Sequence, residues 1–345
     1  MSSPRHIWIL SEGSPGHVSQ SLGLTAAIAA KVPVSIQQFE TRPQFGGLGR
    51  TFVRHLWMGK SGRPLPNSFL RSKLALSPDP TSVPKPDLIV SSGGKSVFAA
   101  RSLAVRYGAP FVFLGERKPY PPEWFHTVFT PSALETEACD VRMDIIPTKI
   151  NPSLVREAAA TWADKPDGTL WAMLIGGPSR SHRYQTSEWE QLAADMADLA
   201  RAHGIRWLVT TSRRTGKEIE ALLREKLPPD VIADSVWWCH EPQKKLAAYL
   251  GSAERLWVTQ DSVSMVTEAA SVGKPVVVLR PSNTPFPPTS FMPGYLENLE
   301  SLGLIQRLPM AGLSSYQEPL LSHPAREALT TESLADITLE RIGWK

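Results

Sequence analysis

The residues best suited to bind a charged ligand lie in the stretch 256–280. Its first apolar run, 256–259, predicts a buried strand, and Asp261 and Ser262 are residue types that cap the start of a helix. A helix that opens at the carboxyl end of a strand presents unpaired N–H groups and its positive dipole end, which favour an anion such as a diphosphate. Glu268 lies seven residues after Asp261, so the two side chains should share one face, about 10 Å apart along the axis. That spacing suits a ribose diol, and the alternative is that Asp261 only caps the helix while Glu268 is solvated.

Two further turns in the second half of the chain carry glycines, hydroxyls and arginines at predicted strand ends. The strand 170–175 runs into one of them, and the strand 205–210 runs into the other. Glycine N–H groups can cradle phosphate oxygens while a guanidinium neutralises them. A surface loop explains either turn alone, but three polar turns at one sheet edge favour a single anionic ligand. The candidate residues of the two turns are Gly176, Gly177, Ser179, Arg180 and Arg183, and Ser212, Arg213 and Arg214.

His17 is the candidate for proton transfer. It follows the first predicted strand, 6–10, and Gly13 and Gly16 let the intervening backbone turn tightly and approach a ligand. In an open α/β sheet, a strand-to-helix junction of this kind faces the crevice where ligands bind, and a histidine there can exchange protons near neutral pH. The alternative is a loop or helix-capping histidine without chemistry.

A glycine-rich turn after the predicted strand 87–91 should lie in the same layer as His17. It contains Gly93, Gly94 and Lys95, followed by a serine, and so looks like a phosphate-binding P-loop. That motif requires glycine where this chain has Ile89, so the P-loop interpretation fails. The turn remains a candidate part of an acceptor-binding site.

The order of the elements predicts an α/β protein with two successive doubly wound domains. Strands and helices alternate over residues 1–150 and again over 151–325, a proline-containing stretch at 147–166 is the expected linker, and 326–345 is expected to close the fold with a helix. The two cysteines lie a hundred residues apart, which implies neither a disulfide framework nor a zinc cluster. No secretory leader or membrane-spanning run is recognisable, so we expect a cytoplasmic protein.

One segment, 41–78, contains seven Lys or Arg residues and no Asp or Glu. Aromatic and aliphatic side chains are interleaved with these charges, a mixture typical of a segment that lies on an anionic bilayer. We therefore expect the part from Arg50 to Lys73 to dock on the inner face of a membrane. A solvated basic flap is the alternative, and nucleic acid is a weaker one because no nucleic-acid-binding module accompanies the segment. The apolar residues concerned are Phe45, Phe52, Trp57, Met58, Phe69 and Leu70.

Four motifs together resemble one family. They are Gly-Ser-Pro-Gly-His-Val-Ser-Gln at 13–20, Ile-Gly-Gly-Pro-Ser at 175–179, Thr-Ser-Arg-Arg-Thr at 211–215 and Thr-Gln-Asp-Ser-Val-Ser-Met at 259–265. With two doubly wound domains, they resemble the GT-B glycosyltransferases. The resemblance is to the family of the plant mitochondrial-fission ELM (elongated mitochondria) protein and its bacterial relatives, and it covers nearly the whole chain. A more distant likeness is to the lipid-intermediate N-acetylglucosaminyltransferase of peptidoglycan synthesis.

The resemblance implies transfer of a sugar from a nucleotide donor, tested first as a UDP-sugar, to a glycolipid or other envelope acceptor in an interdomain cleft. His17 would be the base, with Glu12 or Glu116 as the next candidates, and Arg213 or Arg214 would stabilise the leaving diphosphate. An Asp-x-Asp motif is absent, so no metal and no other cofactor is expected. Two other functions stay open: a nucleotide-sugar epimerase of the same fold, and a non-enzymatic adaptor acting on membrane shape or division.

Overall fold

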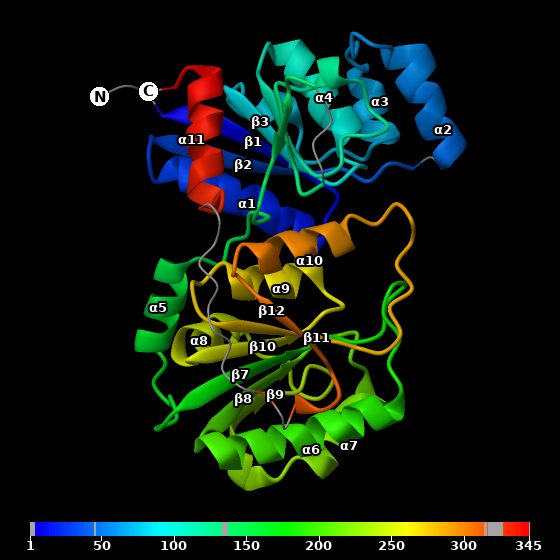
Figure 1. The fold of residues 1–345 in the computed structure, drawn as a ribbon. Coiled ribbons are helices and arrows are strands. Elements are labelled where there is room, and N and C mark those ends of the chain that lie inside the picture. Colours follow the sequence, from blue (N-terminus) through cyan, green and yellow to red (C-terminus); the bar gives the residue numbers. More distant parts are fainter. Residues whose placement is uncertain (1–3, 45, 133–136, 314–315, 317–326, 345) are drawn as a thin grey trace. The chain divides into compact units, whose positions relative to one another are not determined.

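The polypeptide forms two compact units in the computed structural model, which describes residues 4–44, 46–132, 137–313, 316 and 327–344. Unit 1 comprises Met1–Lys149 together with Leu329–Lys345, and unit 2 comprises Ile150–Ala328. The chain therefore leaves unit 1, builds unit 2 and returns to unit 1 for its last helix (Figure 1). None of the described helices is long and apolar enough to cross a bilayer.

Unit 1 is a parallel sheet with helices on both faces (Figure 1). Its strands at 88–92, 111–114 and 127–130 are buried on both sides, as the inner strands of a covered parallel sheet must be. Its elements are β1 (Arg5–Ser11), α1 (Pro15–Ala29), β2 (Val34–Glu40), α2 (Gly47–Phe52), a π-helix (Val53–Met58), α3 (Asn67–Ser72), a 3-10 turn (Pro80–Ser82), β3 (Leu88–Ser92), α4 (Val97–Tyr107), β4 (Phe111–Leu114), a 3-10 turn (Pro122–Trp124), β5 (Thr127–Thr130), β6 (Asp140–Arg142) and α11 (Thr331–Ile342).

The strand order in unit 1 is β2-β1-β3-β4-β5-β6. The chain moves outward from β1 to β2 and then returns to place β3 on the other side of β1, so the order reverses between β1 and β3. Parallel pairing sets Ile9 beside Val90 and Leu10 beside Ser91, which brings the carboxyl ends of these two strands to the same edge. Ligands of open α/β sheets bind at such a switch point.

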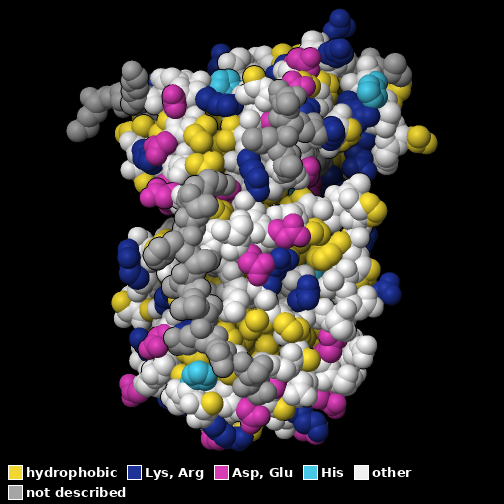
Figure 2. Space-filling view, in the orientation of Figure 1, with side chains coloured by type: hydrophobic (Ala, Val, Ile, Leu, Met, Phe, Trp, Pro, Cys, Tyr) yellow, Lys and Arg dark blue, Asp and Glu magenta, His cyan; other side chains and the backbone are white. Residues whose placement is uncertain are grey.

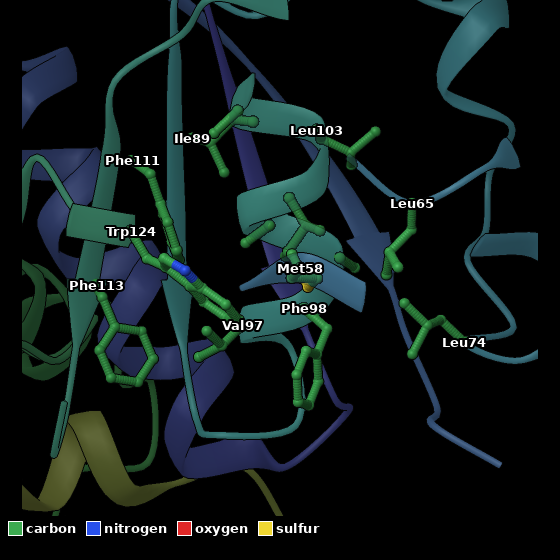
Figure 3. Packing of buried hydrophobic residues seen from close by; sticks show 14 of the residues in the cluster. Met58, Leu65, Leu74, Ile89, Val97, Phe98, Leu103, Phe111, Phe113 and Trp124 are labelled. Atoms are coloured by element: carbon green, nitrogen blue, oxygen red, sulfur yellow. The ribbon is translucent and has the colours of Figure 1, made fainter. Parts of the chain in front are cut away.

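The core of unit 1 extends beneath the basic segment. Met58, Leu65 and Leu74 are fully buried and pack with Val97 and Phe98 of α4 (Figure 3). Further along the same helix, Arg101 donates to the carbonyls of Ser61 and Trp124, which ties the loop after the π-helix to α4. The segment from the π-helix to residue 76 is therefore anchored to unit 1 by its apolar side chains.

Unit 2 is a second parallel sheet covered by helices on both faces (Figure 1). Three of its strands carry a large aromatic core in which Trp171, Trp207 and Trp257 are in ring contact. Its elements are α5 (Pro152–Ala160), β7 (Leu170–Ile175), α6 (Thr186–His203), β8 (Arg206–Thr211), α7 (Lys217–Lys226), a 3-10 turn (Pro229–Val231), β9 (Ile232–Val236), α8 (Leu246–Ser252), β10 (Arg255–Thr259), α9 (Val263–Ala270), β11 (Val276–Arg280), α10 (Met292–Ser301) and β12 (Gln306–Pro309).

The strand order in unit 2 is β12-β11-β10-β7-β8-β9, the order of a dinucleotide-binding Rossmann sheet. Its switch point lies between β7 and β10, where Leu174 pairs with Val258. The expectation of an α/β protein with two doubly wound halves is therefore confirmed. Each half places one pair of loops at a switch point.

One local expectation needs a correction. The expected linker at 147–166 contains α5, because Pro152 is acceptable in the first turn of a helix and Asn151 caps that turn by accepting the Leu154 N–H at 2.9 Å. Pro152 of this stretch thus starts a helix.

Candidate active site

Asp261 is the centre of a polar junction at the switch point of unit 2. Its Oδ2 accepts the Gly177 N–H at 3.0 Å and an Arg214 N–H at 2.5 Å, and its Oδ1 accepts the hydroxyls of Tyr184 at 2.8 Å and Thr259 at 2.7 Å. The carboxylate is completely buried, with 0% of the side chain exposed. Burial and this carboxylate together raise the pKa of Tyr184, so the phenol stays a donor. Asp261 therefore joins the loops that follow β7, β8 and β10.

This geometry corrects the sequence-based role of Asp261. Helix α9 begins at Val263 and its N-cap is Ser262, whose hydroxyl accepts the Met265 N–H at 3.4 Å. Asp261 precedes the cap and its side chain is used inside the protein, so it does not share an exposed helix face with Glu268. Glu268 lies on α9 and is half-buried. Of that pair, only Glu268 keeps the predicted position on the helix.

The glycines after β7 have a role that the sequence did not reveal. The Gly176 N–H donates to the Thr259 hydroxyl at 2.7 Å and the Gly177 N–H to Asp261, so both N–H groups already have acceptors in the protein. A Cβ at Gly176 would lie well under 3.0 Å from the Asp261 carboxylate, and one at Gly177 equally close to the Arg214 backbone. These residues are glycines because the loops pack tightly there, and neither N–H group is free to bind a phosphate.

Arg214 lies beside the start of α9. The Arg214 guanidinium is held by the Asp261 carboxylate and lies within 3.4 Å of the Asp261 carbonyl, just before the helix, yet 39% of the side chain is exposed. Its loop is ordered by Ser212, whose hydroxyl accepts the Arg214 N–H at 3.2 Å. Neighbouring Arg213 is exposed. A guanidinium beside a helix N-terminus is an anion-binding arrangement.

The rest of the β7 loop is ordered by contacts of its own. Ser179 accepts the Ser181 N–H at 3.3 Å and lies at the same distance from Nδ1 of His182, a buried histidine. Burial lowers the pKa of His182. Arg180 and Arg183 are exposed, and the Arg183 N–H donates to the carbonyl of Asn283 at 2.9 Å. Both arginine side chains thus extend from a loop that is fixed at its base.

Sequence reasoning missed a second anchored loop at this edge of unit 2. The buried carboxylate of Glu220, on α7, accepts the Thr211 hydroxyl at 2.6 Å and the Cys239 N–H at 3.0 Å, which fixes the loop after β9. Trp238 in that loop is 43% exposed. Two adjacent tryptophans, at 237 and 238, were the signal that could have identified it.

His17 and Glu12 form a pair at the switch point of unit 1. His17 lies in the first turn of α1, and its Nδ1 is 3.2 Å from Oε1 of Glu12, while Oε2 of Glu12 accepts the Lys95 N–H at 3.1 Å. Gly93 has φ +88° and its α-carbon faces the imidazole, so a Cβ there would collide with His17. Glu12 therefore joins the loops after β1 and β3. The structure brings together His17, Gly93 and Lys95, as the shared layer of these turns predicted.

The remaining candidates of unit 1 lie around the same edge. Gly16 is in the first turn of α1, next to His17, and the Gly94 carbonyl accepts the Tyr120 hydroxyl at 2.6 Å. Burial raises the pKa of Tyr120 to about 12. The positive charges of Arg50 and Arg54 act against this shift and lower the pKa, whereas the charge of Glu12 raises it. Glu116 is exposed beyond β4 and accepts the hydroxyl of Ser132. Glu12 is thus a partner of His17, whereas Glu116 lies outside that pair.

The described residues contain no group of three or more His, Cys, Asp or Glu side chains arranged to hold a metal ion. The two cysteines are free. Burial, together with neighbouring Asp140, raises the pKa of Cys139 to about 11, so this thiol is a poor nucleophile.

Comparison with known proteins gives one family over most of the chain. The family model described as Mitochondrial fission ELM1 matches residues 15–331. The Mitochondrial fission protein ELM1 of Arabidopsis thaliana is 29% identical over 170 residues, which are 47% of this chain and 35% of that protein. The match therefore spans about a third of the length of that curated relative.

Two solved structures are similar in fold to this chain, and the similarity extends over both units. The UDP-GlcNAc 2-epimerase from Methanocaldococcus jannaschii is 12% identical, with a TM-score of 0.53, and the similarity covers 97% of this chain and 99% of that one. The glycotransferase of kitacinnamycin is 15% identical, with a TM-score of 0.51 and coverage of 99% and 94%. At these identities the similarity shows the fold alone, which is the GT-B fold that the motifs had indicated.

Proposed function

Since this chain belongs to the mitochondrial fission ELM1 family, whose motifs it carries on a GT-B fold, we propose that it is a glycosyltransferase that uses a nucleotide-sugar donor. The observation that carries the proposal is the position of Arg214, held by Asp261 at the start of α9 with part of its guanidinium exposed. Transfer of a sugar leaves a diphosphate, and preorganised cationic and N–H donors stabilise the charge that develops on it.

The donor would bind at the switch point of unit 2. Its diphosphate would lie against the N-terminus of α9 and Arg214, with Arg213 able to approach from the same loop. Glu268, farther along α9, would accept hydrogen bonds from the ribose. The exposed ring of Trp238, fixed through Glu220, offers a flat apolar surface for the base. UDP-sugars are the donors to test first, because a UDP-GlcNAc enzyme shares this fold.

The acceptor would be activated in unit 1. His17 uses Nδ1 for Glu12, and among the described residues Nε2 makes no hydrogen bond, so Nε2 is the nitrogen that would take the acceptor's hydroxyl proton. The acceptor oxygen would form a bond to the anomeric carbon as the bond from that carbon to the diphosphate breaks, and the diphosphate would leave with the bonding electrons. Glu12 would stabilise the imidazolium, and a glycolipid is the acceptor we expect.

A thermal-shift screen against nucleotide sugars tests the donor part directly. A ligand at a hundred times its dissociation constant stabilises a protein by about 2.7 kcal/mol, which for a unit of this size corresponds to a shift of about 5 to 10 °C. We expect a UDP-sugar to give such a shift, to keep it in the presence of EDTA, and to lose it in the Arg214→Gln variant. Arg201→Gln, on the exposed face of α6, is the matched control. If no nucleotide sugar shifts the wild type, the proposal fails.

The two other functions predict different results in the same assays. An epimerase would isomerise the sugar of the bound donor without an acceptor and without releasing the nucleotide diphosphate. A non-enzymatic adaptor would neither bind a nucleotide sugar nor convert one. Incubation of the protein with a bound UDP-sugar, followed by nucleotide and sugar analysis, separates the three.

A further inference from the structure

The basic segment of unit 1 divides into a buried part and an exposed part. Met58 and Leu70 belong to the core and Phe69 packs against it, so these three apolar residues do not form a surface (Figure 3). Phe45 and the side chain of Trp57 lie outside the described residues. Of the apolar residues expected to meet a membrane, Phe52 is the one that the structure leaves exposed.

Helix α2 adds a residue that sequence reasoning did not include. Leu48 is 91% exposed and Phe52 is 54% exposed, and their spacing of four puts them on one face of α2. No residue of α2 is buried, whereas the following π-helix is anchored by Val53 and Met58. The apolar pair therefore projects from a helix without buried residues, directly before a π-helix that is anchored in unit 1.

The segment that carries this pair is rich in cations. Of the seven Lys and Arg residues in the segment, Arg42 pairs with Glu40 and Arg71 with Asp79. The other five form no ion pair with any carboxylate in the described ranges; they are Arg50, Arg54, Lys60, Arg63 and Lys73. Figure 2 shows Lys and Arg side chains gathered over the part of unit 1 that contains α2 and α3, with hydrophobic side chains at its edge.

We propose that α2 and the adjoining cations form a docking surface for an anionic lipid bilayer, with Leu48 and Phe52 inserted among the acyl chains and Arg50, Arg54 and Lys60 at the level of the headgroups. The charge complementarity selects the occupant. Unneutralised cations are attracted to an anionic membrane surface, and a projecting apolar pair gains free energy by entering the interface. A cytoplasmic leaflet is such a surface, so the protein would lie on the inner face of its membrane.

The surface adjoins the acceptor side of the candidate active site. The hydroxyl of Tyr120 donates to the carbonyl of Gly94, and its ring stacks on Trp124, whose Nε1 donates to the carbonyl of Gly59 directly after the π-helix. Docking through α2 would therefore hold the loop of Gly93 and Gly94 close to the lipid headgroups. This inference does not depend on sugar transfer, because bilayer binding requires neither donor nor turnover.

Sedimentation with vesicles tests the surface on the intact chain. We expect the wild type to sediment with vesicles of phosphatidylcholine and phosphatidylglycerol at low salt, and poorly with phosphatidylcholine alone. Each cation near an anionic surface contributes about fivefold to partitioning, so R50Q/R54Q/K60Q should bind about 100-fold more weakly. Leu48→Ser with Phe52→Ser should lose about tenfold or more, because the inserted apolar area is removed.

Matched controls come from unit 2. Leu154→Ser removes an exposed leucine from α5, and R201Q/R224Q removes two exposed cations, and both variants should sediment as the wild type does. Undiminished binding of the Leu48 and Phe52 double variant would overturn the proposal, and so would equal binding to phosphatidylcholine alone. A third opposing result is binding to a single-stranded oligonucleotide that the charge variant loses and the apolar variant keeps, which would assign the cations to nucleic acid.

Discussion

Replacing Asp261 by Asn tests the central claim about unit 2, that this carboxylate holds three loops together. The carboxylate accepts four hydrogen bonds, from Gly177, Tyr184, Thr259 and Arg214. An amide offers one acceptor oxygen, which can serve at most two of these donors. At least two donors would therefore face an NH2 group, and the guanidinium would lose its counter-charge.

The expected loss follows from these contacts. Breaking a buried ion pair by removing one partner costs about 3 to 5 kcal/mol, and the partial exposure of Arg214 puts this case near the lower end. We expect the free energy of unfolding of unit 2 to fall by about 3 to 4 kcal/mol, and its melting temperature by about 10 °C. Asp198→Asn is the control, because Asp198 pairs with Arg201 at 3.9 Å on an exposed surface, where such a pair is worth at most about 1 kcal/mol.

Native-state hydrogen exchange read by mass spectrometry assigns the loss to a unit. Peptides from β7 and β10 should lose protection in Asp261→Asn, while peptides from β3 in unit 1 should keep it. If the variant is within about 0.5 kcal/mol of the wild type, the junction does not stabilise unit 2. A variant of unchanged stability with weakened nucleotide binding would instead restore the ligand-binding role that the sequence suggested for Asp261.

Four further outcomes are expected. Glu268→Ala should weaken nucleotide binding by about 1.5 to 3 kcal/mol with the fold intact, as measured by calorimetry, and equal affinities would remove this residue from the site. His17→Ala should cut turnover by a factor of about 10² to 10⁴ with donor affinity unchanged. A decrease in turnover of less than about tenfold would place the base elsewhere. Glu12→Gln should lower turnover less and shift its pH profile, because an amide cannot stabilise an imidazolium; a profile identical to that of the wild type would contradict the pairing. For His182, burial lowers the pKa in the folded state, so the unfolded chain binds the extra proton first, and stability should decline as the pH falls below about 6.5. Denaturation of His182→Gln across this pH range should show a smaller decline in stability than the wild type shows. A pH dependence equal to that of the wild type would contradict this role of His182.

The strand-helix alternation was predictable because it depends on local patterns. The apolar strand 170–175 was predicted with the bounds of β7. Strands with few apolar residues were missed: β2 (Val34–Glu40) is an edge strand with exposed polar side chains, and the short β12 lies at the edge of the other sheet. At an edge, pairing with a neighbour rather than hydrophobic patterning decides that a segment is a strand.

The site was predictable as a set of turns, but not as a set of contacts. Strand order determines which turns meet, and one sequence does not reveal that order, so the contact of Glu12 with the Lys95 N–H across 3.1 Å could not be foreseen. The direction of the Asp261 side chain was equally hidden, since the same residue type caps helices and accepts buried hydrogen bonds. Spacing along a helix was reliable for Glu268 because α9 does form around it.

The return of α11 to unit 1 has a consequence for biosynthesis. Unit 1 receives this helix only after the ribosome has translated all of unit 2, so unit 2 can complete its fold before unit 1 does, although it comes second in the chain. Until then the side of α1 that α11 covers stays open, and Arg5 of β1 lacks the ring of Trp344, whose centre later lies 4.8 Å away. The nascent chain therefore exposes an unfinished apolar surface for as long as unit 2 takes to be made, and this surface is a natural site for a chaperone that acts during translation.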